Sequence, residues 1–65
     1  MNLKNYVDSR PLNEYDLHFV DKTTGQYINI NAKDLERFKF IQEKHLVYDT
    51  FNHRLKATVV VEQIS

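Results

Sequence analysis

Two groups of side chains in this sequence have the residue types and the spacing that a reactive site would need. His45, Asp49 and His53 follow one another at intervals of four residues, so on a helix they would share one face, as metal ligands can. No obvious fourth ligand lies near them, and Asn52-His53 is more typical of a turn than of a helix end. We interpret the spacing as coincidence and expect no metal site.

Asp16 and His18 form the second group, because they are neighbours on one face of a predicted strand. An acid beside a histidine can orient a general base, but no motif places a serine or cysteine nucleophile near this pair. A chain of 65 residues also rarely encloses a pocket of the usual size, about 300 Å³ or more. The pair is typical of a solvent-exposed strand face, so we expect no enzyme and no cofactor.

Residues 14–30 predict a β-hairpin as the first element of the fold. Apolar and polar side chains alternate along residues 14–20, and a period of two indicates a half-buried strand. Residues 21–26 are turn formers around Gly25, the only glycine, which can supply the positive φ of a tight hairpin loop. Residues 27–30 then return as the second strand.

A helix is predicted next, from Ala32 to about Lys44. Asn31 is a good N-cap, Asp34 suits the positive end of the helix dipole, and Ile30 could pack on Leu35 as a hydrophobic staple. No glycine or proline marks the end of this helix. One stripe at helical spacing is expected to face the core and consists of Leu35, Phe38, Ile41 and His45.

A second apolar stripe, formed by Phe40, Val47 and Phe51, falls on nearly the opposite side of that helix. A small domain has one core, so either the helix ends early, with residues 46–48 as a short strand, or the stripe meets a partner. Exposed apolar clusters usually mark interaction sites, and aromatic residues dominate many interfaces. We therefore take Phe40, Val47 and Phe51 as candidate partner contacts, with Glu43 and Lys44 at the rim.

Residues 55–62 predict a further strand with Leu55, Ala57, Val59 and Val61 on one face. Val60, on the polar face, indicates a partly covered second face, a sheet continued across a dimer, or an ordinary exposed valine. The order is β-β-α-β, which predicts an α+β domain over residues 14–65. Its antiparallel sheet has three strands, or four if residues 46–48 add one, and one helix packs on it.

Residues 1–13 are polar and mixed, and Pro11 interrupts them. We expect a loosely ordered N-terminal arm here, in which Leu3, Tyr6 and Val7 are available to dock.

The bulk composition limits the classes of function. A domain of 65 residues is only marginally stable, and with no cysteine it must rely on local structure and self-association. Nine Lys and Arg balance nine Asp and Glu, which gives no global attraction to nucleic acid or an anionic membrane and little self-repulsion. The sequence contains neither an apolar run of roughly 18 residues nor a signal peptide, so we expect a cytoplasmic protein.

The function that these features indicate is binding of another protein by a small, non-enzymatic, accessory or inhibitor-like domain. We expect it to form a homodimer and also to bind an unidentified protein, in the manner of accessory proteins of phages and mobile elements. A nucleic-acid-binding module is the alternative, in which tyrosines and Phe51 supply stacking surfaces. Its basic residues would be Lys33, Arg37, Lys44, Arg54 and Lys56, but acidic residues are interspersed with them.

Three short segments resemble the small phage-encoded inhibitors of uracil-DNA glycosylase. They are Tyr15-Asp16-Leu17, the turn through Gly25 to Gln26-Tyr27, and Asp34-Leu35-Glu36. The resemblance implies a dimer whose helix residues occupy the DNA-binding cleft of the enzyme. The sequence departs from that pattern because Leu35 stands where the family has an aromatic residue, and because the family is acidic whereas this chain is neutral.

Overall fold

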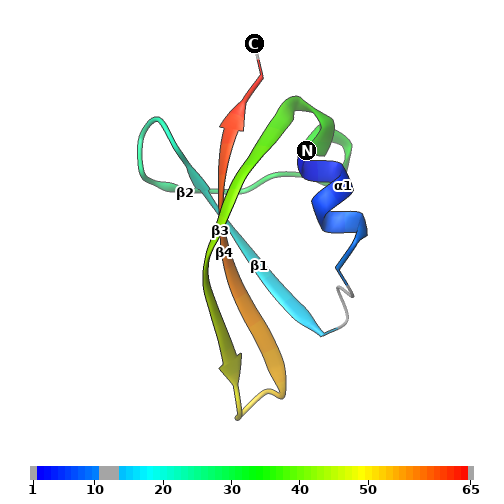
Figure 1. Cartoon of the computed structure of the whole chain (residues 1–65), viewed down its shortest axis with the longest axis vertical. Coiled ribbons are helices and arrows are strands. Elements are labelled where there is room, and N and C mark those ends of the chain that lie inside the picture. Colours follow the sequence, from blue (N-terminus) through cyan, green and yellow to red (C-terminus); the bar gives the residue numbers. More distant parts are fainter. Residues whose placement is uncertain (1, 11–13, 65) are drawn as a thin grey trace.

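A four-stranded mixed sheet forms the frame of the molecule, and its strands are ordered β2-β1-β4-β3 (Figure 1). The computed structural model describes residues 2–10 and 14–64. The elements in chain order are helix α1 (Leu3–Asp8), strands β1 (Tyr15–Asp21) and β2 (Tyr27–Ile28), the 3-10 helix η1 (Ala32–Arg37), and strands β3 (Phe38–Asp49) and β4 (Arg54–Gln63). The α+β class is confirmed.

The hairpin of β1 and β2 and the last strand, β4, are also as predicted. β1 and β2 are antiparallel, with Phe19 opposite Ile28. Gly25 has a φ of 72° in the connecting turn, the left-handed region that favours glycine. The second strand is shorter than expected, because it ends at Ile28 rather than Ile30.

The expectation of an antiparallel sheet is wrong for one pair of strands, because β4 is parallel to β1 and antiparallel to β3. The long connection through β2, η1 and β3 supplies the crossover that a parallel pair needs. β4 thus lies inside the sheet, with Val59 and Val61 fully buried on one face. Val60, on the other face, is also buried, between Val20 of β1 and Gln42 of β3.

The helix predicted for residues 32–44 is also wrong: it is replaced by the 3-10 helix η1 and the 12-residue strand β3. Asn31 makes no side-chain cap to η1, so the expected helix start is weak. The aromatic and β-branched residues that follow suit a strand, and antiparallel pairing with β4 satisfies the backbone groups on one side of that strand. Leu35 is buried as expected, whereas His45 is exposed.

Two irregularities in β3 explain why its sequence resembled a helix. The register with β4 shifts between Phe40 and Gln42, and again between Glu43 and His45. Each shift adds one residue to β3, as a β-bulge does. Residues on the face that carries Phe40 and Glu43 therefore recur every three positions in this stretch, and this interval is close to the period of a helix.

Within the segment expected to be an arm, residues 3–8 form helix α1, which packs against β3 and η1. The side chain of Asn2 caps this helix by accepting a hydrogen bond from the backbone N–H of Asn5 at 2.8 Å. Residues 11–13 of that segment lie outside the described residues. The residues that meet in the core cluster are Leu3, Tyr6, Val7, Leu35, Val59 and Val61.

Candidate functional site

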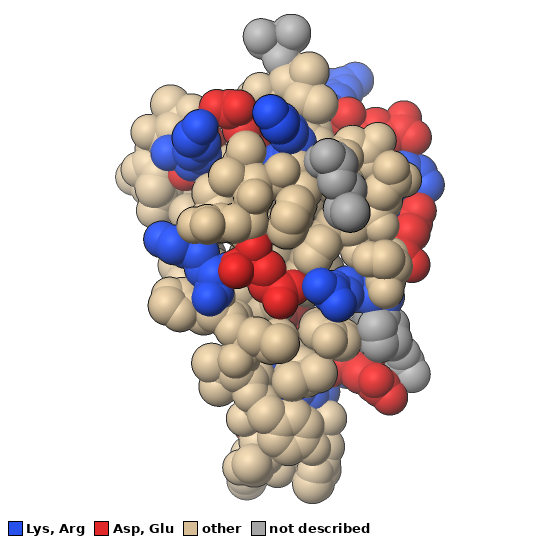
Figure 2. Space-filling model, in the orientation of Figure 1, with Lys and Arg blue, Asp and Glu red and all other residues tan. Residues whose placement is uncertain are grey.

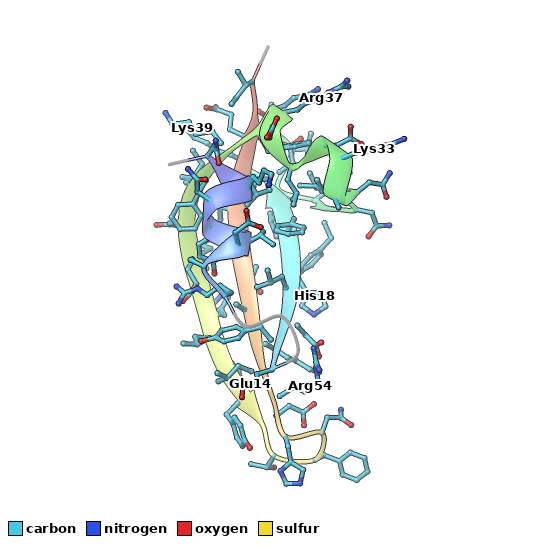
Figure 3. The ribbon with its side chains drawn as sticks, turned by 90° about the vertical axis from the view of Figure 1, so that its right-hand side faces the viewer. Glu14, His18, Lys33, Arg37, Lys39 and Arg54 are labelled. Carbon is cyan, nitrogen blue, oxygen red and sulfur yellow. The ribbon has the colours of Figure 1, made fainter. Side chains whose placement is uncertain are left out.

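The β3–β4 hairpin extends past α1 and forms the narrow end of a molecule whose principal dimensions are 38 × 22 × 17 Å (Figure 1). We call residues 45–56, which join the lower part of β3 to the start of β4, the hairpin arm. Figure 3 shows α1 in front of the upper half of the sheet only. Among the described residues, no helix therefore covers the arm on the face that α1 covers higher up.

Large apolar side chains are exposed on this arm. The exposed fractions are 52% for Leu46, 58% for Val47, 53% for Tyr48 and 89% for Phe51. In the space-filling view of Figure 2, uncharged side chains cover the narrow end, and charged side chains gather on the broad part. Clusters of exposed apolar side chains usually mark an interaction site.

Alternation along the strand divides three of these side chains between the two faces of the sheet. Leu46 and Tyr48 lie opposite Ala57 and Leu55 of β4, on the face that carries α1. Val47 lies opposite Lys56, on the other face. A partner that covers all three side chains must therefore meet the edge of the sheet or both of its faces.

β3 is an edge strand, and its outer side is open along the arm. Among residues 2–10 and 14–64, the one bridge on that side joins Asn2 to Lys39, near the start of β3. An uncovered edge strand presents backbone N–H and C=O groups that can pair with another chain. The arm thus combines exposed apolar side chains with free backbone pairing groups.

Asp49 holds the turn of the arm in place. Its Oδ1 accepts hydrogen bonds from the backbone N–H of Phe51 at 3.0 Å and of Asn52 at 3.3 Å. Its Oδ2 accepts from the side chain of Asn52 at 2.9 Å and lies 3.4 Å from Nζ of Lys56. The hydrogen bonds from Asn52, then that from Phe51, hold the pKa of the Asp49 carboxyl below its usual range. This turn fixes the backbone that carries Phe51.

The five predicted contact residues lie in two places. Val47 and Phe51 belong to the arm, and Lys44 is an exposed residue at the second bulge, just before it. Phe40 and Glu43 instead face α1, since Phe40 stacks on the ring of Tyr6 with centroids 4.5 Å apart.

Glu43 belongs to a polar cluster between α1 and β3. It accepts hydrogen bonds from the hydroxyl of Tyr6 and from Nη2 of Arg10, the latter at 3.2 Å. Burial and the hydrogen bond to Glu43 raise the pKa of Tyr6 to about 12. The cluster links α1 to the sheet, so Glu43 and Phe40 serve packing in the structure.

Leu46 and Tyr48 are exposed apolar residues of the arm that were not among the contact residues predicted from the sequence. The helical interpretation assigned neither of them to the second stripe. The signal was present in the run Leu46-Val47-Tyr48, whose β propensity is high and which is too apolar for a solvated edge.

The two groups of potentially reactive residues are not assembled in the structure. Asp16 accepts a hydrogen bond from Nε of Arg54 at 2.8 Å, and His18 makes an edge contact with Tyr27, with centroids 6.4 Å apart. His45 and Asp49 lie on β3 and His53 in the turn. Within the described part of the chain we find no metal-binding cluster and no pocket.

The basic residues do not gather into one unpaired patch. Arg37 pairs with Asp34 at 3.8 Å, and Arg54 and Lys56 bind Asp16 and Asp49, as given above. Three of the five bases of the predicted patch thus have acidic neighbours, which lowers the potential that a nucleic acid would meet.

No helix in the described residues is long and apolar enough to cross a membrane. The three segments that resemble uracil-DNA glycosylase inhibitors lie in β1, at β2 and in η1, and the first of them pairs with Leu55 and Lys56 at the β4 end of the arm. No protein-family model, curated protein or solved structure matches the chain with significant similarity.

Proposed function

We propose that this chain is a small, non-enzymatic protein-binding domain and that the hairpin arm is its binding surface. The single observation that carries the proposal is the exposure of Leu46, Val47, Tyr48 and Phe51 on one arm with an open strand edge. Burying the exposed half of such a side chain would stabilise the protein by roughly 1 kcal/mol for each residue. A partner that covers the arm would recover this free energy.

The arm is separate from the core, which supports a role in binding rather than in folding. The core cluster is formed by α1, η1 and the upper parts of the strands. None of the four exposed arm residues belongs to that cluster or to the residues packed against it. Substitutions in the arm can therefore remove binding and leave the domain folded.

Strand addition is the binding mode that the arm suits best. A partner strand that pairs with β3 forms main-chain hydrogen bonds with it, and the side chains of β3 determine the specificity of binding. Inhibitor-like and accessory roles are both compatible with this mode. A cytoplasmic location and the binding of a foreign protein remain predictions from the sequence.

Site-specific photo-cross-linking tests the proposal. A benzoylphenylalanine replaces Phe51 in the arm or, in a matched control, Tyr27, an aromatic residue that is 72% exposed at the opposite edge of the sheet. Extract from the cells that naturally express the chain is irradiated with each protein. We expect adducts, with a second copy or another protein, from position 51 and few from position 27. Equal yields at both positions, or no adduct at position 51, would contradict the proposal.

A further inference from the structure

The free edge of β3 contains one regular segment, from His45 to Asp49. These five residues pair with Thr58 to Arg54 of β4 one by one, with no register shift. The second bulge ends the regular ladder on the side of Glu43, and the turn ends it after Asp49. Val47 is the central residue of this segment.

The segment is complementary to itself about its centre. If two copies meet antiparallel with Val47 opposite Val47, Leu46 lies opposite Tyr48 of the other copy, and His45 lies opposite Asp49. Directly opposed side chains lie on the same face and within contact distance. Every exposed apolar side chain of the segment then gains an apolar neighbour, and the acid gains a partner that can donate a hydrogen bond.

We propose that a second copy of this chain pairs with the arm along this edge, with a twofold axis that is perpendicular to the sheet and passes between the two Val47 residues. The inference rests on the proposed function and names the partner. The two sheets join into one sheet of eight strands in which β3 pairs with β3. A twofold axis closes the assembly, so the product is a dimer rather than a filament.

Other registers fit less well. A centre at Leu46 opposes Glu43 to Asp49, which are like charges. A centre at His45 opposes Glu43 to Val47 and Lys44 to Leu46, and it uses the bulged stretch, where a regular ladder cannot form. The bridge from Asn2 to Lys39 occupies the upper edge in each copy. The zero net charge of the chain adds no overall repulsion between copies.

Single cysteines test the register, because the chain has no cysteine of its own. Opposed residues in an antiparallel pair have Cα atoms about 4.5–5.5 Å apart, within the range of a disulfide. Val47→Cys is therefore expected to form a disulfide-linked dimer under mild oxidation. Phe51→Cys is the control: the strands alone separate the two copies of Asp49 by about 14 Å along their length, and residue 51 follows Asp49 in the turn, so it should react at least tenfold more slowly.

A mixture of Leu46→Cys and Tyr48→Cys proteins fixes the pairing further. The Val47-centred register predicts that disulfide-linked dimers of one variant with the other are more abundant than dimers of either variant with itself. Preferred Leu46→Cys homodimers would overturn this register in favour of a centre at Leu46. Equal rates for all cysteines would indicate random collision and would also overturn the proposal.

Sedimentation velocity on proteins without cysteine gives a second readout. Val47→Lys brings two like charges together beside the axis and should weaken dimerisation at least tenfold, whereas Tyr27→Lys, at the opposite edge of the sheet, should leave it within threefold of the wild type. A wild type that stays monomeric at millimolar concentration would overturn the pairing of copies. Cross-links from position 51 to another protein would in that case leave the proposed function standing, and their absence would remove both.

Discussion

Replacing Leu3 by alanine is the strongest test of the core in this structure, because the sequence alone placed Leu3 in a loosely ordered N-terminal segment. Leu3 is fully buried in the core cluster with Tyr6, Val7 and Leu35. Removing a buried leucine costs the transfer free energy of the lost carbons and the cavity that remains, about 3 kcal/mol. The total free energy of unfolding of a domain of 65 residues is about 3–10 kcal/mol. Leu3→Ala should therefore remove about 30% or more of the free energy of unfolding.

Leu46→Ala is the matched control, since it makes the same chemical change at a side chain that is 52% exposed. We expect a loss below about 1 kcal/mol there. Urea unfolding at low micromolar concentration, followed by far-ultraviolet circular dichroism, gives the free energy of unfolding of each variant. Similar losses at the two positions, or a larger loss at Leu46, would refute the assignment of α1 to the core and of the arm to the surface.

Two further predictions concern Tyr6 and Asp49. The pKa of Tyr6 is raised from 10.0 to about 12 in the folded chain, so its stabilising effect is complete below pH 10 and is lost as pH rises through 12. The resulting loss in the free energy of unfolding is about 2–3 kcal/mol. This loss should be absent in Tyr6→Phe when unfolding is measured from pH 8 to 12. The lowered pKa of Asp49 means that its stabilising effect is present above pH 3.8 and is lost as pH falls further. Asp49→Ala should accelerate amide exchange at Phe51 and Asn52 without changing exchange at Val59, and unchanged exchange at all three would contradict its role in the turn.

Local patterns were sufficient for the hairpin of β1 and β2 and for β4. Strict alternation along β1, the positive φ available to Gly25, and the valine-rich run of β4 each depend on neighbouring residues only. The burial of Val60 shows that the run Val59-Val60-Val61 belongs to a strand inside the sheet, a signal that sequence reasoning noted without deciding between its explanations.

β3 could not be predicted from periodicity, because its two bulges are defined by pairing with a strand that follows it. The bulges at Ile41 and Lys44 replace an interval of two by an interval of three, so the apolar spacing suggests a helix. Parallel pairing of β1 with β4 is likewise set by packing between segments about 40 residues apart. Local propensity carries no information on such pairing.

The N-terminal helix was missed for a different reason. Leu3, Tyr6 and Val7 follow the i, i+3, i+4 pattern of a helix face, and Asn2 is a capping residue, but the segment is too short to be stable alone. Its packing on β3 and η1 supplies the missing stability. Of the candidate site, the exposed Val47 and Phe51 were anticipated, whereas the role of Glu43 toward Tyr6 depends on a contact 37 residues apart.

If the hairpin arm is the binding surface, a partner covers it where the protein works. Cysteine labelling measures this cover whether the partner is a second copy or another protein. Val47→Cys and, as control, Tyr27→Cys are each labelled with a maleimide under reducing conditions, both as dilute purified protein and in extract of the native cells. We predict that the extract slows labelling at position 47 at least tenfold and leaves position 27 within twofold. Equal effects of the extract at the two positions would contradict the claim.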